Sequence, residues 1–261
     1  MSGRVASLLA AGLLSAAACD PLGTNNTSPD VASISDLILP SPSVVVGEIM
    51  RDSSGVEAPV TLNAYDRDGR LLVNQTVSIN VLDASVTIDQ SRFVHGVTVD
   101  TVGARVIAGA GTLQTQPVRI PVSVHPDFTT TTVASSTINF PIPATDSTSN
   151  ANWSVPLDLL MTGNGSRGAQ GFIVKYSIIK QPAGLNGAPT VYLIDGDPNR
   201  PTSRDTTSAS GHASRRVVIR SAQLANIAKT DTIVVRATAS YAGLVIGGLP
   251  IDFTIQIKKT P

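Results

Sequence analysis

Few residue types in this sequence can take part in covalent or metal chemistry. The 261 residues include one cysteine, Cys19, and three histidines, His95, His125 and His212. None of the histidines lies in a metal-ligand spacing such as H-x-x-x-H, so we interpret all three as solvent-exposed loop residues. No G-x-S-x-G motif marks a nucleophilic serine. The sequence therefore predicts no catalytic residue, no cofactor and no small-molecule substrate, and it indicates a protein that is not an enzyme.

One segment rich in turn residues begins like a calcium-binding loop. Asp195, Asp197 and Asn199 have the spacing of the first ligands in the D-x-[DN]-x-[DN]-G pattern. Arg200 stands where that pattern needs glycine, and Thr206 occupies the twelfth position in place of glutamate. The same segment favours an ordinary turn, because Asp, Gly, Pro and Asn all adopt turn conformations readily. We therefore predict no metal site and keep this loop as the one candidate.

The segment before Cys19 has the features of an N-terminal leader. Arg4 and the free amine form a short positive region, and residues 5–18 are a mostly apolar stretch that ends in small residues. This composition is typical of a signal peptide. The stretch is too short to cross a bilayer, which needs about 20 residues. We predict that residues 1–18 are a signal peptide that is removed on export.

The residues before Cys19 resemble the bacterial lipobox, in which small residues precede a cysteine that receives a diacylglycerol on its sulfur. The motif favours leucine where this chain has Ala16. The resemblance implies that Cys19 is lipidated and that the membrane is a partner, because two or more acyl chains give stable anchoring. The alternative is an ordinary secretory cut after Ala18, which would leave Cys19 as a free thiol.

The predicted location follows from this leader. We expect an exported protein that is lipid-anchored to a bacterial membrane, on the periplasmic face or at the cell surface. Asp20 resembles the inner-membrane retention signal of enterobacterial lipoproteins, and the choice between inner and outer membrane stays open. No apolar run after residue 19 has the length of a membrane span.

Composition excludes several classes of function. Nineteen Lys and Arg residues balance nineteen Asp and Glu residues, so the basic surface of a nucleic-acid-binding protein is not expected. Aromatic residues make up only 4% of the chain, too few for a carbohydrate-stacking platform. A single cysteine allows no intramolecular disulfide, so core packing must hold the fold together.

Short alternating runs of apolar and polar residues predict an all-β fold. Turn residues recur every 8 to 12 positions, as in antiparallel β-sandwiches. We predict a lipidated tether over 19–31 and two immunoglobulin-like β-sandwiches. The first spans 32–126, a Thr- and Ser-rich linker spans 127–149, and the second spans 150–261 with an insertion near 195–214. A short connecting helix is expected over 221–228, and Pro121 predicts an edge strand or a bulge.

The second half of the chain repeats the order of runs in the first. The run at 155–160 corresponds to 60–65, the run at 172–178 to 77–81, and the run at 250–257 to 117–124. Two copies of one sandwich account for this order most simply.

The first predicted domain resembles the bacterial immunoglobulin-like domains of invasins, intimins and many surface lipoproteins. The resemblance rests on the runs at 40–42, 46–48, 60–64 and 66–69 and on 103–108. It implies a spacer or interaction module that contacts a protein or another envelope component. The alternative is an accessory structural subunit of a larger membrane complex, with the insertion near 195–214 as its docking loop.

Overall fold

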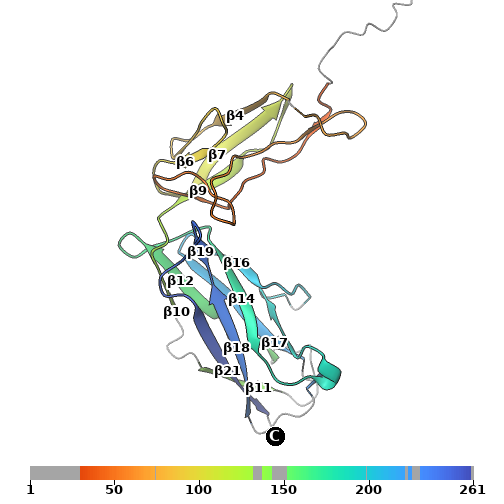
Figure 1. Cartoon of the computed structure of the whole chain (residues 1–261), viewed down its shortest axis with the longest axis vertical. Helices are drawn as coiled ribbons and strands as arrows, with labels where there is room; N and C mark the ends of the chain where they lie inside the picture. The colour runs from red at the N-terminus through yellow and green to blue at the C-terminus, as the bar shows by residue number, and fades with distance from the viewer. Residues whose placement is uncertain are drawn as a thin grey trace, which may run out of the picture.

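The computed structural model describes residues 30–73, 75–131, 137–142, 152–197, 199–220, 223–224 and 230–259. The predicted signal peptide, Cys19, most of the tether and most of the predicted helix at 221–228 lie outside these residues. The described chain folds into two β-sandwiches that follow one another along the long axis of the molecule (Figure 1). Its helical content includes a 3-10 turn, η2 (Leu185–Gly187).

The first sandwich has one continuous sheet in the strand order β2-β9-β7-β4. Its strands are β2 (Val44–Val45), β9 (Val118–Ser123), β7 (Asp100–Ala110) and β4 (Val77–Val81), with β8 (Leu113–Gln114) paired to the end of β7. The opposite layer consists of two short antiparallel pairs. They are β1 (Ser33–Ile34) with β3 (Ala64–Tyr65), and β5 (Val86–Ile88) with β6 (Val94–Gly96).

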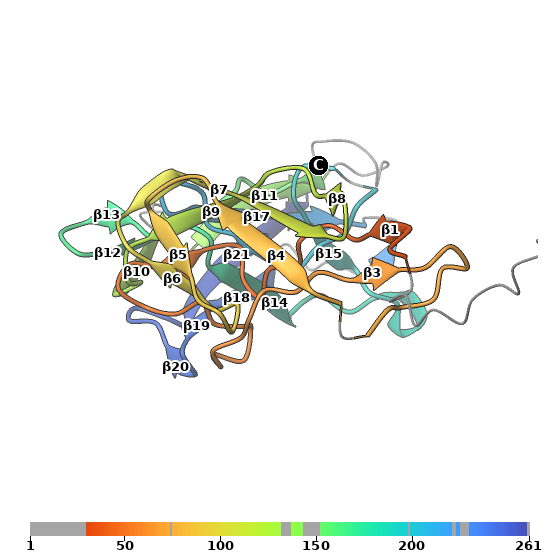
Figure 2. The same cartoon turned by 90° about the horizontal axis from the view of Figure 1, so that it is seen from above.

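The second sandwich has two five-stranded sheets. One sheet has the order β10-β12-β17-β15, from β10 (Phe128–Thr131), β12 (Leu157–Gly163), β17 (His212–Ile219) and β15 (Val191–Ile194), with β13 (Arg167–Gly168) on β12. The other has the order β11-β21-β18-β14-β16, from β11 (Thr137–Ile142), β21 (Ile251–Lys259), β18 (Thr230–Thr238), β14 (Ile173–Lys180) and β16 (Arg204–Thr206). A small hairpin, β19 (Ser240–Tyr241) with β20 (Leu244–Val245), projects at one side (Figure 2).

The two sandwiches share one topology. In each sandwich the last long strand has an early strand parallel to it on one side and the preceding long strand antiparallel to it on the other. The order is β2-β9-β7 in the first sandwich and β11-β21-β18 in the second. Next in order come β4 and β14, which hold equivalent positions, as the repeat in the sequence predicts. The four-stranded order β10-β12-β17-β15 opposite this sheet is the A-B-E-D order of an immunoglobulin fold. The predicted fold class, all-β with two tandem immunoglobulin-like sandwiches, is confirmed.

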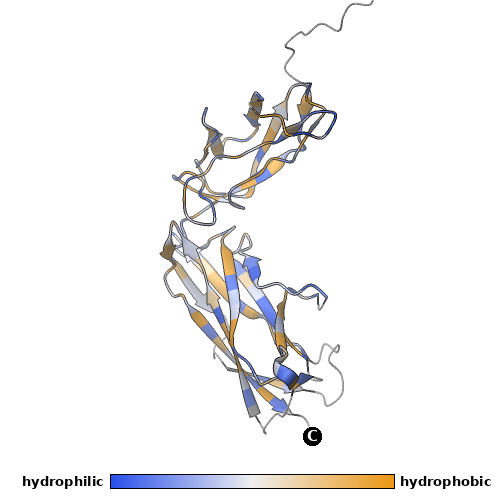
Figure 3. Cartoon of the chain, turned by 45° about the vertical axis from the view of Figure 1, so that its right-hand side comes forward, coloured by the Kyte–Doolittle hydropathy of each residue, from blue (hydrophilic) through white to orange (hydrophobic). Residues whose placement is uncertain are grey.

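Period-two burial gives each sandwich its core. Along β12 every second residue is buried and the residues between them are half-buried, so one face packs inward. Figure 3 shows hydrophobic and hydrophilic residues in turn along the strands of both sandwiches. The larger core lies in the second sandwich and includes Leu157, Leu159, Met161, Val174, Tyr176, Val217, Ile233, Val235, Phe253, Ile255 and Ile257. The first core includes Met50, Val60, Ala104, Val106, Ala108, Ile120 and Val122. Its central strand β7 supplies mostly alanine and valine, so the first sandwich buries smaller side chains.

The sheet bulges opposite Pro121, but the extra residues belong to β7 and not to the strand that contains the proline. β9 is not an edge strand, because it pairs with both β2 and β7, but its register with β7 shifts between Asp100 and Ala104. The side chain of Asp100 closes the extra loop of chain by accepting hydrogen bonds from the backbone N–H groups of Val102 and Gly103, each at 3.0 Å. Gly103 adopts φ +91°, a conformation that glycine favours. The bulge thus allows Pro121, which has no backbone N–H to donate, to lie inside the sheet.

The predicted linker at 127–149 is wrong. This stretch contains β10, which pairs with β12, and β11, which runs parallel to β21, so the chain enters the second sandwich directly after the first. Thr and Ser content suggested a linker, but threonine also has a high strand propensity. Thr129 is 2% exposed in β10, although neither its type nor its spacing predicts burial. Composition could not reveal this pairing, because the partner strands are distant in the sequence.

The predicted insertion near 195–214 is not a free loop. The stretch contains β16, which pairs with β14, and the start of β17, which lies between β12 and β15. Its Asp, Gly, Pro and Asn residues form the turn before β16, and a strand of only three residues shows no clear alternation. The segment is therefore part of both sheets, and it is not a free docking loop.

We predict that Tyr176→Phe destabilises the second sandwich. The Tyr176 hydroxyl is fully buried and donates a hydrogen bond to the carbonyl oxygen of Ala213 at 2.9 Å, which joins the two sheets. Loss of this bond should lower the free energy of unfolding by about 1 kcal/mol, measured by urea denaturation. The control is Tyr192→Phe, because the Tyr192 hydroxyl makes no hydrogen bond to the described residues and its ring packs against Arg220. Equal effects of the two substitutions would contradict this role.

Candidate functional site

The junction between the two sandwiches contains no free linker. β9 ends at Ser123 and β10 begins at Phe128, so residues 124–127 make the whole connection. Val124 is 1% exposed and packs in the core of the second sandwich. The carbonyl oxygen of His125 lies so close to Gly163 that a Cβ at this glycine would overlap it. Packing on both sides therefore fixes the path of the connection.

Hydrogen bonds also cross the junction away from the connection. Ser43 Oγ donates to the carbonyl oxygen of Gln170 at 2.8 Å, and the Gln170 N–H donates to Ser123 Oγ at 2.8 Å. Ser43 and Ser123 belong to the first sandwich and are 6% and 1% exposed. Gly171 has φ +83° and lies directly against Ser43, where any side chain would collide. This close approach lets both serines bond to the backbone of the second sandwich.

Tyr241 in the β19-β20 hairpin makes the third contact across the junction. Its hydroxyl donates to Glu48 Oε2 at 2.8 Å, and Arg51 Nε lies 3.6 Å from the same oxygen. The Tyr241 ring packs edge-on against His125 at 5.3 Å and Phe172 at 5.5 Å between ring centroids. Burial raises the pKa of Tyr241, and the Glu48 carboxylate raises it further, so the hydroxyl stays protonated and able to donate.

A groove of about 700 Å³ runs along this junction. Its walls come from residues 40–45 and 51–55 of the first sandwich and from β14, β16, β18 and the β19-β20 hairpin of the second. Apolar side chains and four cations line it: Val45, Phe172, Tyr241 and Val245, with Arg51, Lys175, Arg204 and Arg236. The groove exists because the two sandwiches are held in one orientation. Its volume lies in the range of about 300–1,000 Å³ typical of ligand sites.

The loop that begins like a calcium site forms turns. Asp195 Oδ1 accepts the N–H of Asp197 at 3.2 Å, and Asp197 Oδ1 accepts the N–H of Asn199 at 2.9 Å. Each carboxylate thus holds its own backbone two residues on, which is an Asx turn. No group of three or more His, Cys, Asp or Glu side chains that could hold a metal occurs among the described residues.

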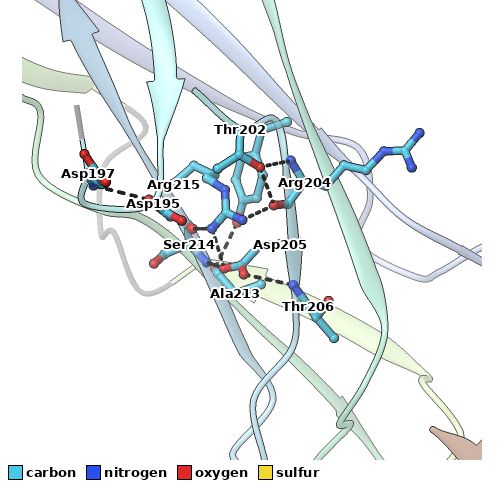
Figure 4. Close-up of polar contacts among 10 residues, drawn as sticks. Asp195, Asp197, Thr202, Arg204, Asp205, Thr206, Ala213, Ser214 and Arg215 are labelled. Atoms are coloured by element: carbon cyan, nitrogen blue, oxygen red, sulfur yellow. Dashed lines mark hydrogen bonds and ion pairs between the residues drawn. The ribbon is translucent and has the colours of Figure 1, made fainter. Parts of the chain in front are cut away.

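Next to this turn lies an ion pair that the sequence did not reveal. Arg215 of β17 is 7% exposed, and its guanidinium lies 3.0 Å from Asp205 Oδ2 of β16 (Figure 4). Asp205 also accepts the N–H groups of Thr206 and Ser214, and Arg215 donates to the carbonyl oxygens of Ser214 and Arg204. These contacts join β16 of one sheet to β17 of the other, so we assign the pair a structural role.

Each histidine contacts an aspartate, which the sequence interpretation missed. The pairs are His95 with Asp89 at 3.3 Å, His125 with Asp127 at 2.8 Å and His212 with Asp158 at 2.9 Å. His95 lies in β6 and His212 in β17, so only His125 occupies a loop as predicted. Among the described residues, no serine hydroxyl bonds to any of these rings. The described residues therefore show no serine placed as a hydrolytic triad requires.

The junction residues had almost no signal in the sequence. Glu48 lies in the 46–48 run, which contributed only to the family resemblance, and Lys175 lies in the 172–178 run, which predicted only a strand. Tyr241 stood in no run or motif. The reason is that the site is assembled from segments about 200 residues apart, and spacing along a chain does not report such contacts. Cys19, the one residue with assigned chemistry, lies outside the described residues, and its lipidation stays a prediction.

The fold and junction define the class of protein: tandem immunoglobulin-like β-sandwiches with a closely packed interface between them. No protein-family model matches the sequence, and no curated protein matches it. Among the described residues, no helix is long and apolar enough to cross a membrane.

Several solved structures match this chain at low sequence identity. The Yersinia pseudotuberculosis adhesin InvE is 14% identical over 90% of this chain, with a TM-score of 0.34, and the chain spans 61% of its length. Domains 4 and 5 of the S-layer protein SbsC are 12% identical over 76% of this chain and 90% of theirs, with a TM-score of 0.28. Human CDH23 EC21-23 is 11% identical over 86% of this chain and 69% of its own, also at 0.28. The fold assignment rests on strand order, not on these likenesses.

We predict that Tyr241 and Glu48 are energetically coupled across the junction. A double-mutant cycle of Tyr241→Phe and Glu48→Gln should give a coupling free energy of about 1–2 kcal/mol. Either substitution alone removes the hydrogen bond to the carboxylate, so the second substitution has no such bond left to remove. The measurement is urea denaturation of the four proteins. Tyr65→Phe with Glu48→Gln is the control cycle, since Tyr65 lies in β3 within the first sandwich. A coupling no larger than in this control would show that the contact contributes no stability.

Acid should weaken the junction through Asp127. The N–H of Asn164 bonds to Asp127 Oδ2 at 2.9 Å and lowers the pKa of this carboxyl, and His125 lowers it further. Because the pKa is lower in the folded chain, the stabilisation is present above the unfolded value of about 3.9 and is lost as pH falls through the folded pKa. Asp127→Asn should therefore be less stable than the parent at pH 7 and lose less stability between about pH 5 and 2.

Thermal denaturation at a series of pH values checks this prediction. Asn164→Gly is the matched control, because it keeps the backbone donor and suits the φ of +36° at this position. The control should keep the parent's pH dependence even if its overall stability changes. An Asp127→Asn profile parallel to that of the parent would rule out the proposed contribution.

Proposed function

We propose that the protein is a non-enzymatic envelope lipoprotein, anchored through a lipid on Cys19, whose two sandwiches act as a stiff spacer and interaction module. The observation that carries the proposal is the junction. Domains joined by flexible linkers move relative to one another by default. Here a four-residue connection, two serine hydrogen bonds and the Tyr241 contact oppose such motion. A stiff pair of domains suits a protein that must hold a binding surface at a fixed distance from a membrane.

The arrangement of the chain supports the same function. β1 lies near the end of the first sandwich that is farther from the second, and the C-terminal strand β21 lies in the second sandwich (Figure 1). The tether that would lead to Cys19 joins the chain just before β1. A lipid anchor there would place the second sandwich on the side away from the bilayer, where it could meet a partner.

The observations do not favour the alternative of an accessory subunit with a docking loop near 195–214. The accessory-subunit alternative required that the polar segment near 195–214 lie outside both sheets. Instead, β16 and β17 place the segment within the two sheets, and Asp205 and Arg215 connect them. A hydrolase is not favoured either, since no serine hydroxyl among the described residues bonds to the histidine ring of a His–Asp pair.

We predict that Cys19→Ser releases the protein from membranes. Without a thiol no diacylglycerol can be attached, and the remaining chain has no apolar run long enough to span a bilayer. The expected result is a shift from the membrane fraction to the soluble exported fraction, with loss of palmitate labelling. Ser28→Ala, a change in the predicted tether that leaves the leader intact, should stay in the membrane fraction. Unchanged partitioning and labelling of Cys19→Ser would disprove the anchor.

A further inference from the structure

Two cations in the groove between the sandwiches have no acidic partner. Lys175 of β14 and Arg204 of β16 are directly opposite in the strand pairing, so both project from the same outer face. Figure 4 shows the Arg204 side chain extending away from Asp205 and Arg215. Among the described residues, no carboxylate lies within ion-pair distance of Lys175 or Arg204. The groove therefore carries two unneutralised positive charges side by side.

The other cations of the groove are neutralised within the fold. Arg236 pairs with Asp252 through two hydrogen bonds of 2.8 Å, and Arg51 pairs with Glu57 at 3.1 Å and with Glu48 at 3.6 Å. The contrast makes the unpaired Lys175 and Arg204 notable, because like charges opposite one another in a sheet are destabilising. Local conflicts of this kind are expected where a sequence serves binding.

The one acidic side chain that lines the groove is already satisfied. Asp52 lies on the wall formed by the first sandwich, and its Oδ1 accepts hydrogen bonds from Ser54 N, Ser54 Oγ and Val56 N at 2.6–3.0 Å. These bonds lower the pKa of Asp52, so it is occupied in shaping its own loop. Asp52 therefore does not serve as the partner of the cations on the opposite wall.

Apolar surface lies beside these cations. Val245 in β20 lines the groove and is 67% exposed, and its neighbour Leu244 is 74% exposed. Pro40, Pro42 and Pro250 line other parts of the groove. A ligand that fits this surface combines carboxylates with apolar side chains, as an extended acidic polypeptide does.

The aromatic residues argue against a glycan in this groove. Sugar rings are bound largely by stacking on exposed aromatic faces, but Phe172 is only 7% exposed. The Tyr241 ring is packed edge-on against Phe172 and His125, and its hydroxyl is bonded to Glu48. Neither ring offers a free platform, so charge complementarity and the exposed aliphatic residues favour a peptide.

We propose that the groove between the sandwiches binds an extended acidic segment of a partner protein, with Lys175 and Arg204 pairing with its carboxylates and Val245 contacting an apolar side chain. This inference deepens the proposed function, on which it rests, by naming the surface and the chemistry of the partner. The pairs would lie at a partly solvent-exposed groove, so binding should weaken as salt rises.

The test uses the full chain, purified in detergent, and a phage-displayed library of random dodecapeptides. Selection against the parent protein should enrich peptides with Asp or Glu beside Leu, Ile or Val. Fluorescence anisotropy then measures an enriched peptide with the variant Lys175→Glu/Arg204→Glu. Affinity should fall roughly tenfold for each cation replaced, because each loses a charge-assisted contact. Replacing the peptide's acidic residues by lysine should restore binding to this variant and abolish it with the parent.

The matched control is Arg167→Glu/Lys180→Glu, which makes the same charge change at exposed residues outside the groove. It should bind the acidic peptide like the parent. Failure to enrich acidic peptides, or equal binding by the parent and Lys175→Glu/Arg204→Glu, would overturn the inference. Tighter binding of a carboxylated glycan than of any selected peptide would overturn it as well.

One further experiment distinguishes failure of the proposed function from failure of the groove as the binding surface. A protein that co-purifies from native membranes with both the parent and Lys175→Glu/Arg204→Glu would support the interaction module and refute the groove as its binding surface. Loss of that protein with the groove variant, but not with the Arg167→Glu/Lys180→Glu control, would support both.

Discussion

Burial of one face of each strand between two sheets is the constraint on which this structure depends. The single cysteine excludes an internal disulfide, so each sandwich is held together by its packed core and backbone ladders. The second sandwich meets this constraint with large side chains such as Leu159, Ile233 and Phe253. It also joins its sheets through Tyr176 and the Asp205–Arg215 pair. The first sandwich, built around alanine and valine in β7, buries less and carries shorter strands opposite its continuous sheet.

The junction extends this packing beyond a single domain. Val45 of the first sandwich and Val124 of the connection both belong to the core cluster of the second sandwich. Polar groups buried at the contact are bonded across it, as Ser43 is to Gln170. A fixed orientation has a functional consequence, because the groove has one wall from each sandwich. If the domains moved freely, Lys175, Arg204 and Val245 would lie on an open surface, without the wall that residues 40–45 and 51–55 of the first sandwich provide.

Local patterns in the sequence predicted those parts of the fold that depend on local physics. Period-two alternation predicted β4, β9, β12 and β14. A proline inside an apolar run predicted an edge strand or a bulge, and the bulge lies in the neighbouring strand β7, opposite Pro121. The repeat predicted that β4 and β14, and likewise β9 and β21, hold equivalent positions. β10, β11 and β16 were missed because their compositions indicated a linker and an insertion. Their identity as strands comes from partners far away in the sequence.

The sequence by itself determined the all-β class, the repetition of one sandwich and the expectation of a lipid on Cys19. Each of these depends on residue type and on short-range spacing, which a linear pattern records. Only the tertiary structure decided that the two sandwiches are joined without a linker, that Tyr241 bonds to Glu48, and that Lys175 lies opposite Arg204. These contacts connect segments that are far apart along the chain. Their geometry is set by strand pairing and by packing between domains, and neither leaves a signal in local sequence.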